Sequence, residues 1–286
     1  MKSFPDSIGQ ALGEGVLQQA LAAAQQRWGA RLVAAYALGS LAHGGFSAHV
    51  SDVDVGFVLS DPLAEGDAQT VAALAAQVKA TRMPLAERLS VFWGSPATLA
   101  GAAEGGRFPP VDRLDLVESG RLLAGRDIRP KVMAPSAREM VLAAAAQALR
   151  SLSVPEVFEQ LRNPASLVAA GVRPLTKRIL FPVRFLFTAR TGRIGRNDAA
   201  VEFFVREESG PAASLALKGF EWRYEPPSPG DPAVLECVQS GLLPLYRLFV
   251  EDYGARLRAL GEAELAQAFA DWRSRLSQVL SSSCRA

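Results

Sequence analysis

The sequence predicts an α+β protein with a sheet-containing first domain and an all-helical second domain. The chain has 286 residues, 49% of them hydrophobic, and at this length two domains with ordinary cores are the natural expectation. Apolar runs typical of strands are concentrated in the first 125 residues. Beyond the segment Ile128-Arg129-Pro130-Lys131 they nearly vanish and helical spacing takes over. We therefore divide the chain into residues 1–130 and 131–286.

The expected elements follow one another along the chain. The first domain should contain a helix over 8–26, a strand over 31–38, a short helix from Leu41, a strand over 52–59, a helix over 68–79 and a strand over 87–93. Residues 97–110 predict a loop, and residues 114–125 predict a short strand followed by a turn and an apolar tail. In the second domain, helices are expected over 136–152, over 174–191 with a kink at Pro182, and after Asp198, Pro232 and Glu262.

Composition argues against several classes of protein. The 31 basic and 29 acidic residues leave a net charge of +2, which is not the basic footprint of a nucleic-acid-binding protein. The start of the chain lacks a secretory apolar stretch, and no segment approaches the roughly 20 apolar residues that span a bilayer, so we expect no membrane partner. The two cysteines, Cys237 and Cys284, have no metal-binding spacing. A reducing, cytoplasmic setting fits best.

The sequence Ser51-Asp52-Val53-Asp54 places two carboxylates at alternate positions of one strand. Alternation directs Asp52 and Asp54 to one face, about 7 Å apart along the chain. At that separation they repel by roughly 2 to 3 kcal/mol at an effective dielectric of about 20, so a cation between them would stabilise the pair. Hard oxygen ligands of this kind suit Mg²⁺, which commonly adds water and phosphate oxygens.

The pair Gly39-Ser40 follows the first strand and is suited to binding phosphate. Glycine lets the backbone approach a phosphate closely, and the amides that open the next helix attract anions. Either motif alone also fits a simpler interpretation, a turn followed by a polar edge strand with solvated acids. Together, in this order and within one strand-turn-strand unit, the two motifs favour a phosphate site beside a metal site.

These residues resemble the signature of the DNA polymerase β-like nucleotidyltransferase superfamily, in which Gly-Ser precedes Ser-Asp-x-Asp. The resemblance implies a small mixed sheet with flanking helices, and a third carboxylate from a later strand. Glu87, at the start of the apolar run 87–93, is the best candidate for that carboxylate. The alternative for Glu87 is a solvated acid at the beginning of a strand. We expect Asp52, Asp54 and Glu87 to converge beside Gly39 and Ser40.

A second resemblance, to the aminoglycoside adenylyltransferases that modify streptomycin and spectinomycin, reaches into the helical domain. It rests on Gly44-Gly45-Phe46 and on the segment from Arg184 through Thr191-Gly192 to Asn197-Asp198-Ala199-Ala200. Asn197 stands where these enzymes have a phosphate-contacting lysine, with Arg196 beside it as a substitute. Their drug-recognising acid is also missing, because the stretch 172–178 is basic here. Lys177 and Arg184, seven residues apart, should share a helix face. If they line the ligand-binding cleft expected between the domains, they should favour a triphosphate over a polycation; the alternative is a solvated pair.

The resemblance implies Mg²⁺-dependent transfer of a nucleoside monophosphate, AMP from ATP in the first place, to a hydroxyl group of a small molecule. Asp52, Asp54 and Glu87 would hold up to two Mg²⁺ ions, or Glu87 would take the proton of the attacking hydroxyl. Gly39 and Ser40 would hold the β and γ phosphates, and Ser51 would shape the turn into the acidic strand. The alternatives are an aminoglycoside adenylyltransferase proper, an antitoxin-like enzyme that modifies a protein, and a non-catalytic nucleotide-binding regulator. The acceptor, the preferred nucleotide and the oligomeric state stay open.

Overall fold

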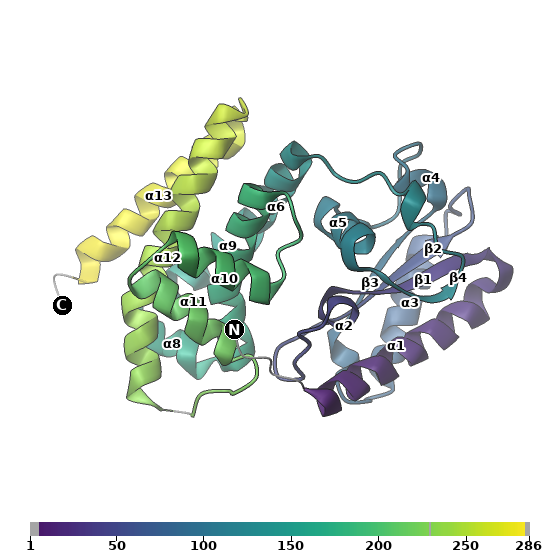
Figure 1. Cartoon of the computed structure of the whole chain (residues 1–286), viewed down its shortest axis with the longest axis horizontal. Coiled ribbons are helices and arrows are strands. Elements are labelled where there is room, and N and C mark those ends of the chain that lie inside the picture. Colours follow the sequence, from purple (N-terminus) through teal and green to yellow (C-terminus); the bar gives the residue numbers. More distant parts are fainter. Residues whose placement is uncertain (1–5, 229, 284–286) are drawn as a thin grey trace. The chain divides into compact units, whose positions relative to one another are not determined.

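The computed structural model describes residues 6–228 and 230–283 and divides the chain into two compact units, Lys2–Pro135 and Ser136–Ala286 (Figure 1). The division falls at Pro135, five residues after the expected boundary at 130. The segment 128–131, which the sequence predicts to connect the two domains, explains this difference. The amide of Ile128 donates to the Tyr36 hydroxyl at 2.7 Å, and this hydroxyl donates to Asp127 at 2.9 Å. These bonds hold the segment on the first unit.

The first unit contains a four-stranded mixed sheet with helices on both faces. Its elements are α1 (Ser7–Trp28), η1 (Gly29–Arg31), β1 (Leu32–Leu38), α2 (Gly39–His43), β2 (Val53–Leu59), α3 (Asp67–Ala80), η2 (Ala86–Arg88), β3 (Leu89–Gly94), α4 (Pro96–Leu99), α5 (Pro110–Ser119), β4 (Arg121–Gly125) and η3 (Arg129–Lys131). The strand order is β3-β2-β1-β4. β1 pairs antiparallel with β2 and β4, and β2 pairs parallel with β3.

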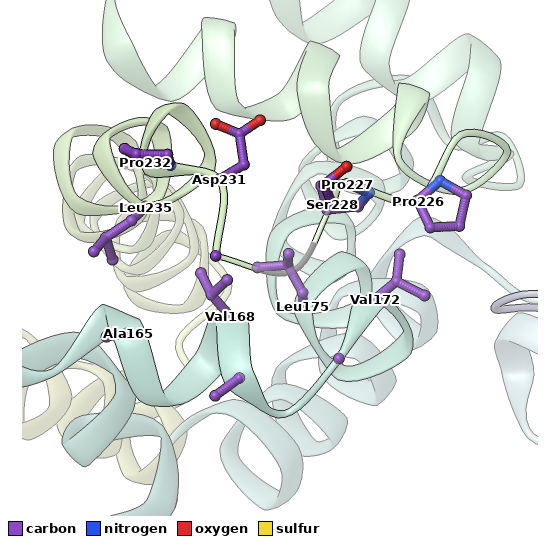
Figure 2. Close-up of a pocket in the computed structure, with 13 residues that line it drawn as sticks. Ala165, Val168, Val172, Leu175, Pro226, Pro227, Ser228, Asp231, Pro232 and Leu235 are labelled. Atoms are coloured by element: carbon purple, nitrogen blue, oxygen red, sulfur yellow. The ribbon is translucent and has the colours of Figure 1, made fainter.

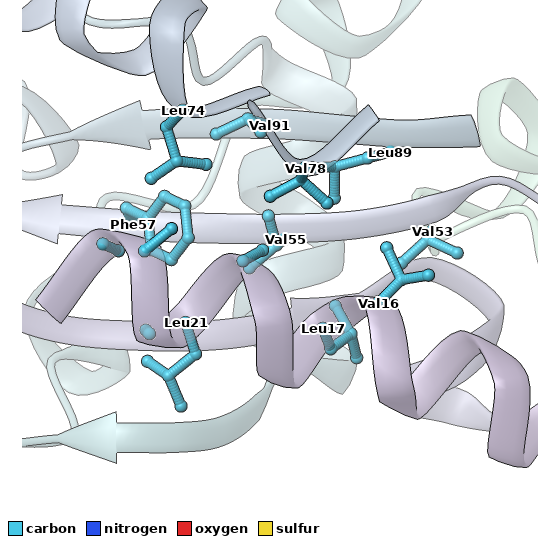
Figure 3. Packing of buried hydrophobic residues seen from close by; sticks show 14 of the residues in the cluster. Val16, Leu17, Leu21, Val53, Val55, Phe57, Leu74, Val78, Leu89 and Val91 are labelled. Carbon is cyan, nitrogen blue, oxygen red and sulfur yellow. The ribbon is translucent and has the colours of Figure 1, made fainter. Parts of the chain in front are cut away.

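Alternation along the strands separates two apolar clusters, one on each face of the sheet. The larger cluster joins Val53, Val55 and Phe57 of β2 to buried residues of α1 and α3 (Figure 3). The smaller cluster, on the opposite face, joins Tyr36 and Leu38 of β1 to Phe92 of β3 and to Leu116 of α5. α1 and α3 therefore cover one face of the sheet, and α5 covers the other. The even-numbered residues of β2 point to the face that α5 covers.

Three expectations for the first unit were wrong. Residues 97–99, predicted as part of a loop, belong to the short helix α4. The strand expected from Glu87 begins at Leu89, because residues 86–88 form the turn of η2. The strand expected from Leu114 is the helix α5, and the sheet is completed by β4, the segment taken for a turn and tail. Pro110 occupies the first turn of α5, where its missing N–H costs nothing, and the buried Leu114 and Leu116 anchor the helix on the sheet.

The second unit is all helical, as expected. Its helices are α6 (Ala137–Leu152), α7 (Pro155–Arg162), α8 (Pro164–Ala169), α9 (Val172–Thr191), α10 (Asn197–Glu207), α11 (Pro211–Glu221), α12 (Pro232–Ala259) and α13 (Ala263–Ser283). Ser136 caps α6 in a capping box with Glu139. An aromatic cluster of Phe249, Tyr253 and Phe269 joins α12 to α13. Three of these helices within the described residues, α7, α8 and α11, are not among those that the sequence predicts.

By length and composition alone, α12 is apolar enough to cross a membrane. Its buried face carries Leu242, Tyr246 and Phe249, all less than 2% exposed, and packs within the helical unit. A central helix of a helical bundle passes the same test, so this property does not by itself define a span. Cys237 on the same helix is a free thiol, and Cys284 lies outside the described residues.

A buried acid that the sequence analysis did not single out ties α1 to α3. Asp67, 2% exposed, accepts hydrogen bonds from both guanidinium NH groups of Arg31 at 3.0 and 2.8 Å, from the indole of Trp28 at 3.2 Å and from the Ala64 amide at 2.7 Å. The Arg31 side chain beside it lowers the pKa of the Asp67 carboxyl below its usual value. This network connects the end of α1 to the start of α3 on the face of the sheet that both helices cover.

We predict that Asp67→Asn lowers the free energy of unfolding by roughly 2 kcal/mol at pH 7, the size of a lost charged hydrogen bond. A depressed pKa means that the unfolded chain binds more protons, so this contribution is complete above the unfolded pKa near 4 and is lost in more acidic solution. Urea unfolding at pH 7 and at pH 3 measures it, with exposed Glu65→Gln as the matched control. Equal sensitivity to acid in both variants would contradict this role for Asp67.

Candidate functional site

The Gly-Ser turn begins where β1 ends. Gly39 is the first residue of the short helix α2 and has a φ of +59°, a conformation in which a side chain is strained. Asp54 on the neighbouring strand lies against it: a methyl group added at Gly39 would come within 2.6 Å of Asp54 Oδ2. Glycine is thus required at this position for two reasons, backbone conformation and the close approach of a carboxylate.

Sheet register explains how Asp54 reaches the turn. Asp54 is the cross-strand partner of Leu38, the residue directly before Gly39. Both Asp52 and Asp54 are half-buried. Asp52 immediately precedes β2, and with two-residue alternation it shares the side of Asp54. The Gly-Ser turn and the acidic pair that the sequence predicted to be neighbours are therefore adjacent in this part of the chain.

Ser51 shapes the loop that leads into β2. Its buried hydroxyl accepts a hydrogen bond from the amide of Ser47 at 3.0 Å, while its own amide donates to the Ser47 carbonyl at 2.9 Å. Arg88 braces the same loop by donating to the carbonyl of Ala48 at 2.6 Å. These contacts fix the backbone just before Asp52, which is the turn-shaping role expected of Ser51.

The structure does not place Glu87 with the two aspartates. Glu87 lies in η2, its side chain is 66% exposed, and its carboxylate pairs with the neighbouring Arg88 at 3.3 Å. Even a longer β3 would not bring it into the site, because Glu87 is in phase with Leu89, which faces α1 and α3. The β3 residue beside Asp54 is Ser90. The hypothesis that Glu87 converges with Asp52 and Asp54 was wrong for this physical reason.

An acid that the sequence analysis missed lies at the turn instead. Asp115 of α5 is 6% exposed, and its Oδ2 accepts a hydrogen bond from the Gly39 amide at 2.5 Å. Its Oδ1 is buried without a hydrogen-bond partner. A signal was present in the sequence, because Asp115 interrupts the apolar pair Leu114 and Leu116, and an acid between two buried residues of a helix has an unusual environment. The assignment of this segment as a strand concealed it.

The remaining predicted contacts belong to the helical unit. Arg196 precedes α10 and pairs with Asp198 at 2.8 Å, and Asn197 begins the helix. Lys177 and Arg184 of α9 both lie over the ring of Phe181, at 6.0 and 5.8 Å from its centre, so they share a helix face as expected. Arg184 also donates to the carbonyl of Gly195 at 2.5 Å, next to Arg196.

The helical unit also contains an apolar cavity of about 650 Å³. It is formed by α8, the start of α9 and the proline-rich segment that leads into α12, with Val168, Leu175, Pro227 and Leu235 among its lining residues (Figure 2). Neither Arg196 nor Asn197 is among the residues that line it. The cavity is thus separate from the residues predicted to contact phosphate.

The donor set near the turn fits a Mg²⁺ ion that also binds a nucleotide. Within residues 6–228 and 230–283, no three His, Cys, Asp or Glu side chains group closely enough to hold a metal ion on their own. Mg²⁺ does not need such a cage, since it usually takes one or two carboxylates together with water and phosphate oxygens. Asp52 and Asp54 supply that number. A second ion would need another donor, and Glu87 is not placed to provide it.

Comparison with known proteins identifies the fold. No protein-family model matches the chain, and no curated protein matches its sequence. Among solved structures, the chain is similar to the spectinomycin adenyltransferase AAD(9) from Enterococcus faecialis, determined with ATP and spectinomycin. The match has a TM-score of 0.54 and 11% sequence identity, and it covers 92% of this chain and 99% of that one. The two chains therefore share their α+β fold, a mixed sheet with flanking helices followed by a helical region.

We predict that Gly39→Ala lowers stability by about 1 to 2 kcal/mol, the cost of a left-handed non-glycine residue, and in addition displaces Asp54 from the turn. Gly192→Ala is the matched control, because Gly192 has a φ of +71° and open space around its Cα. Both variants should lose similar stability in urea unfolding. Only Gly39→Ala should weaken ATP binding in calorimetry, and equal binding by the two variants would contradict the contact with Asp54.

Proposed function

We propose that this protein is a Mg²⁺-dependent nucleotidyltransferase that moves AMP from ATP to a hydroxyl group of a small molecule and releases pyrophosphate. One observation carries the proposal: the Gly39 turn packs directly against the carboxylate of Asp54. A phosphate-binding turn and a hard anionic ligand thus occur side by side, which is what binding of a metal-triphosphate requires. The likeness to an adenyltransferase solved with ATP supports the same class of reaction.

In this proposal the residues act by positioning and by charge. Gly39 would let the backbone come close to the β and γ phosphates, since its amide already donates to Asp115, and Ser40 would bind them. Asp52 and Asp54 would hold Mg²⁺, and Ser51 fixes the backbone before them. Bound there, Mg²⁺ would neutralise charge on the phosphates and orient them. The acceptor hydroxyl oxygen attacks the α phosphorus and its proton passes to water, the bond from the α phosphorus to the oxygen that bridges to the β phosphate breaks, and pyrophosphate leaves. Arg196 and Asn197 are proposed as further phosphate contacts from the helical unit.

The class of acceptor follows from charge on α9. Lys177 and Arg184 present two cations on the face that carries Phe181, and we propose that they favour a neutral or anionic acceptor and oppose a polycationic drug. A second candidate, transfer to spectinomycin or a related drug, is favoured by one observation. The likeness to the spectinomycin enzyme extends through 92% of this chain, so it includes the helical unit as well as the sheet.

A single assay tests the proposal and separates the two acceptor classes. The protein is incubated with Mg²⁺ and ATP or GTP labelled at the α phosphate, and with spectinomycin, streptomycin, or pools of neutral and anionic metabolites. Label transferred to a metabolite, with equimolar pyrophosphate, is the expected result. Efficient labelling of either drug would overturn the inference from Lys177 and Arg184. A protein that binds no nucleotide and transfers none would overturn the proposed function.

We predict that Asp54→Asn reduces transfer by about a thousandfold, because loss of metal charge at the phosphates removes several kcal/mol of transition-state stabilisation. Its thermal midpoint should stay the same or rise, since one of two repelling charges is removed. Glu87→Gln makes the same chemical change on the exposed η2 and should keep nearly full activity. Loss of transfer in Glu87→Gln would show that Glu87 takes part in the reaction, contrary to its exposed position.

A further inference from the structure

We propose that Asp115 is a positioning residue of the nucleotide site, which holds the Gly39-Ser40 turn in the conformation that receives the β and γ phosphates. This inference rests on the proposed function and deepens it. Asp115 would not contact the nucleotide itself. It would act through the backbone amide of Gly39, from a helix that is 76 residues further along the chain.

The hydrogen bond from Gly39 to Asp115 has the features of a strong constraint. It joins a backbone N–H to a carboxylate at 2.5 Å, and the carboxylate is 6% exposed. Hydrogen bonds to an ionised acceptor are about twice as strong as neutral ones, and burial reduces competition from water. The N–H of Gly39 is also an end group of α2 with no partner inside that helix. Asp115 therefore supplies the partner that the helix lacks.

Two carboxylates fix Gly39 from different directions. Asp115 holds its amide, and Asp54 packs against its Cα so closely that an added methyl group would come within 2.6 Å of Oδ2. Gly39 has a φ of +59°, which its chain neighbours alone do not enforce. Because Ser40 follows immediately, the direction of its amide and hydroxyl depends on how Gly39 is held.

Asp115 is itself held in place by the sheet. α5 covers the face on which Asp54 lies, with Leu116 buried beneath it. At the end of α5, Arg129 donates to the carbonyl of Gly120 at 2.8 Å, and the same guanidinium pairs with Asp127 at 2.7 Å. The helix that carries Asp115 is thus anchored at both its apolar face and its C-terminal end.

The unpartnered oxygen argues against a purely structural role. A residue selected only to cap α2 would gain from a partner on both oxygens, because a buried acceptor without a hydrogen bond costs free energy. Asp115 keeps Oδ1 buried and without a partner, and a buried group of this kind in a native site calls for an explanation. The negative charge of Asp115 strengthens its hydrogen bond to the Gly39 amide. This gain offsets the free energy that is lost by burying Oδ1 without a partner.

The experiment measures the affinity of the full chain for ATP and for AMP, each with Mg²⁺, by isothermal titration calorimetry. AMP lacks the β and γ phosphates, so it does not report on the turn. Asp115→Asn keeps the shape but replaces the ionised acceptor with a neutral one. We expect its affinity for ATP to fall by about tenfold or more, with its affinity for AMP nearly unchanged.

Two variants of the same helix serve as controls. Glu118→Gln makes the same chemical change at an exposed position of α5 and should leave both affinities unchanged. Leu116→Ala removes buried packing and should lower the melting temperature while preserving the ratio of ATP to AMP affinity. Circular dichroism identifies a temperature at which every variant is folded.

The outcomes separate this inference from the function on which it rests. Equal loss of ATP and AMP affinity in Asp115→Asn, or no loss of either, overturns the positioning role while nucleotide transfer stands. An Asp115→Asn protein that unfolds while Leu116→Ala stays folded makes Asp115 a folding residue and overturns it as well. A wild-type protein that binds neither nucleotide overturns the proposed function and this inference together.

Discussion

The contact of Gly39 with two carboxylates is the constraint on which the candidate site depends. Its amide donates to Asp115, and its Cα lies against Asp54. At its φ of +59°, any residue other than glycine would be strained. Like charges near one turn cost free energy unless something compensates them. Here an amide hydrogen compensates one carboxylate, and in the proposed function a hydrated Mg²⁺ with phosphate would compensate the other. The site thus combines a held glycine turn with a half-buried carboxylate beside it.

Strand pairing, apolar packing and buried hydrogen bonds in the rest of the first unit fix the position of this turn. Antiparallel pairing of β1 with β2 sets Asp54 opposite Leu38, one residue before the turn. The larger apolar cluster fixes the sheet on α1 and α3, and Asp67 connects these two helices by charged hydrogen bonds in a buried position. On the opposite face, burial in the sheet raises the pKa of Tyr36 to about 12, and its hydroxyl holds the segment after β4. One face of the sheet is thus fixed by α1 and α3, and the other by the hydrogen bonds of Tyr36.

The helical unit contributes charge and apolar surface. Lys177 and Arg184 flank one aromatic ring, and Arg184 reaches the backbone at Gly195. The apolar cavity near Leu175 contains none of the predicted phosphate contacts. Likeness in fold to a spectinomycin adenyltransferase reaches across most of the chain, and at 11% identity it shows the architecture alone.

The sequence by itself determined the α+β class, the helical second unit and the adjacency of Gly39-Ser40 with Asp52 and Asp54, because these depend on local periodicity and on residues close together in the chain. The sequence pattern also bears on Glu87: it precedes an apolar run, but the phase of Leu89 and Val91 puts it on the opposite face from Asp54. Only the tertiary structure shows which further acid lies at Gly39. Asp115 could not be found in the same way, because its link to Gly39 spans 76 residues and depends on α5 packing across the sheet. Local patterns specify which face a residue occupies, whereas long-range packing decides which residues meet.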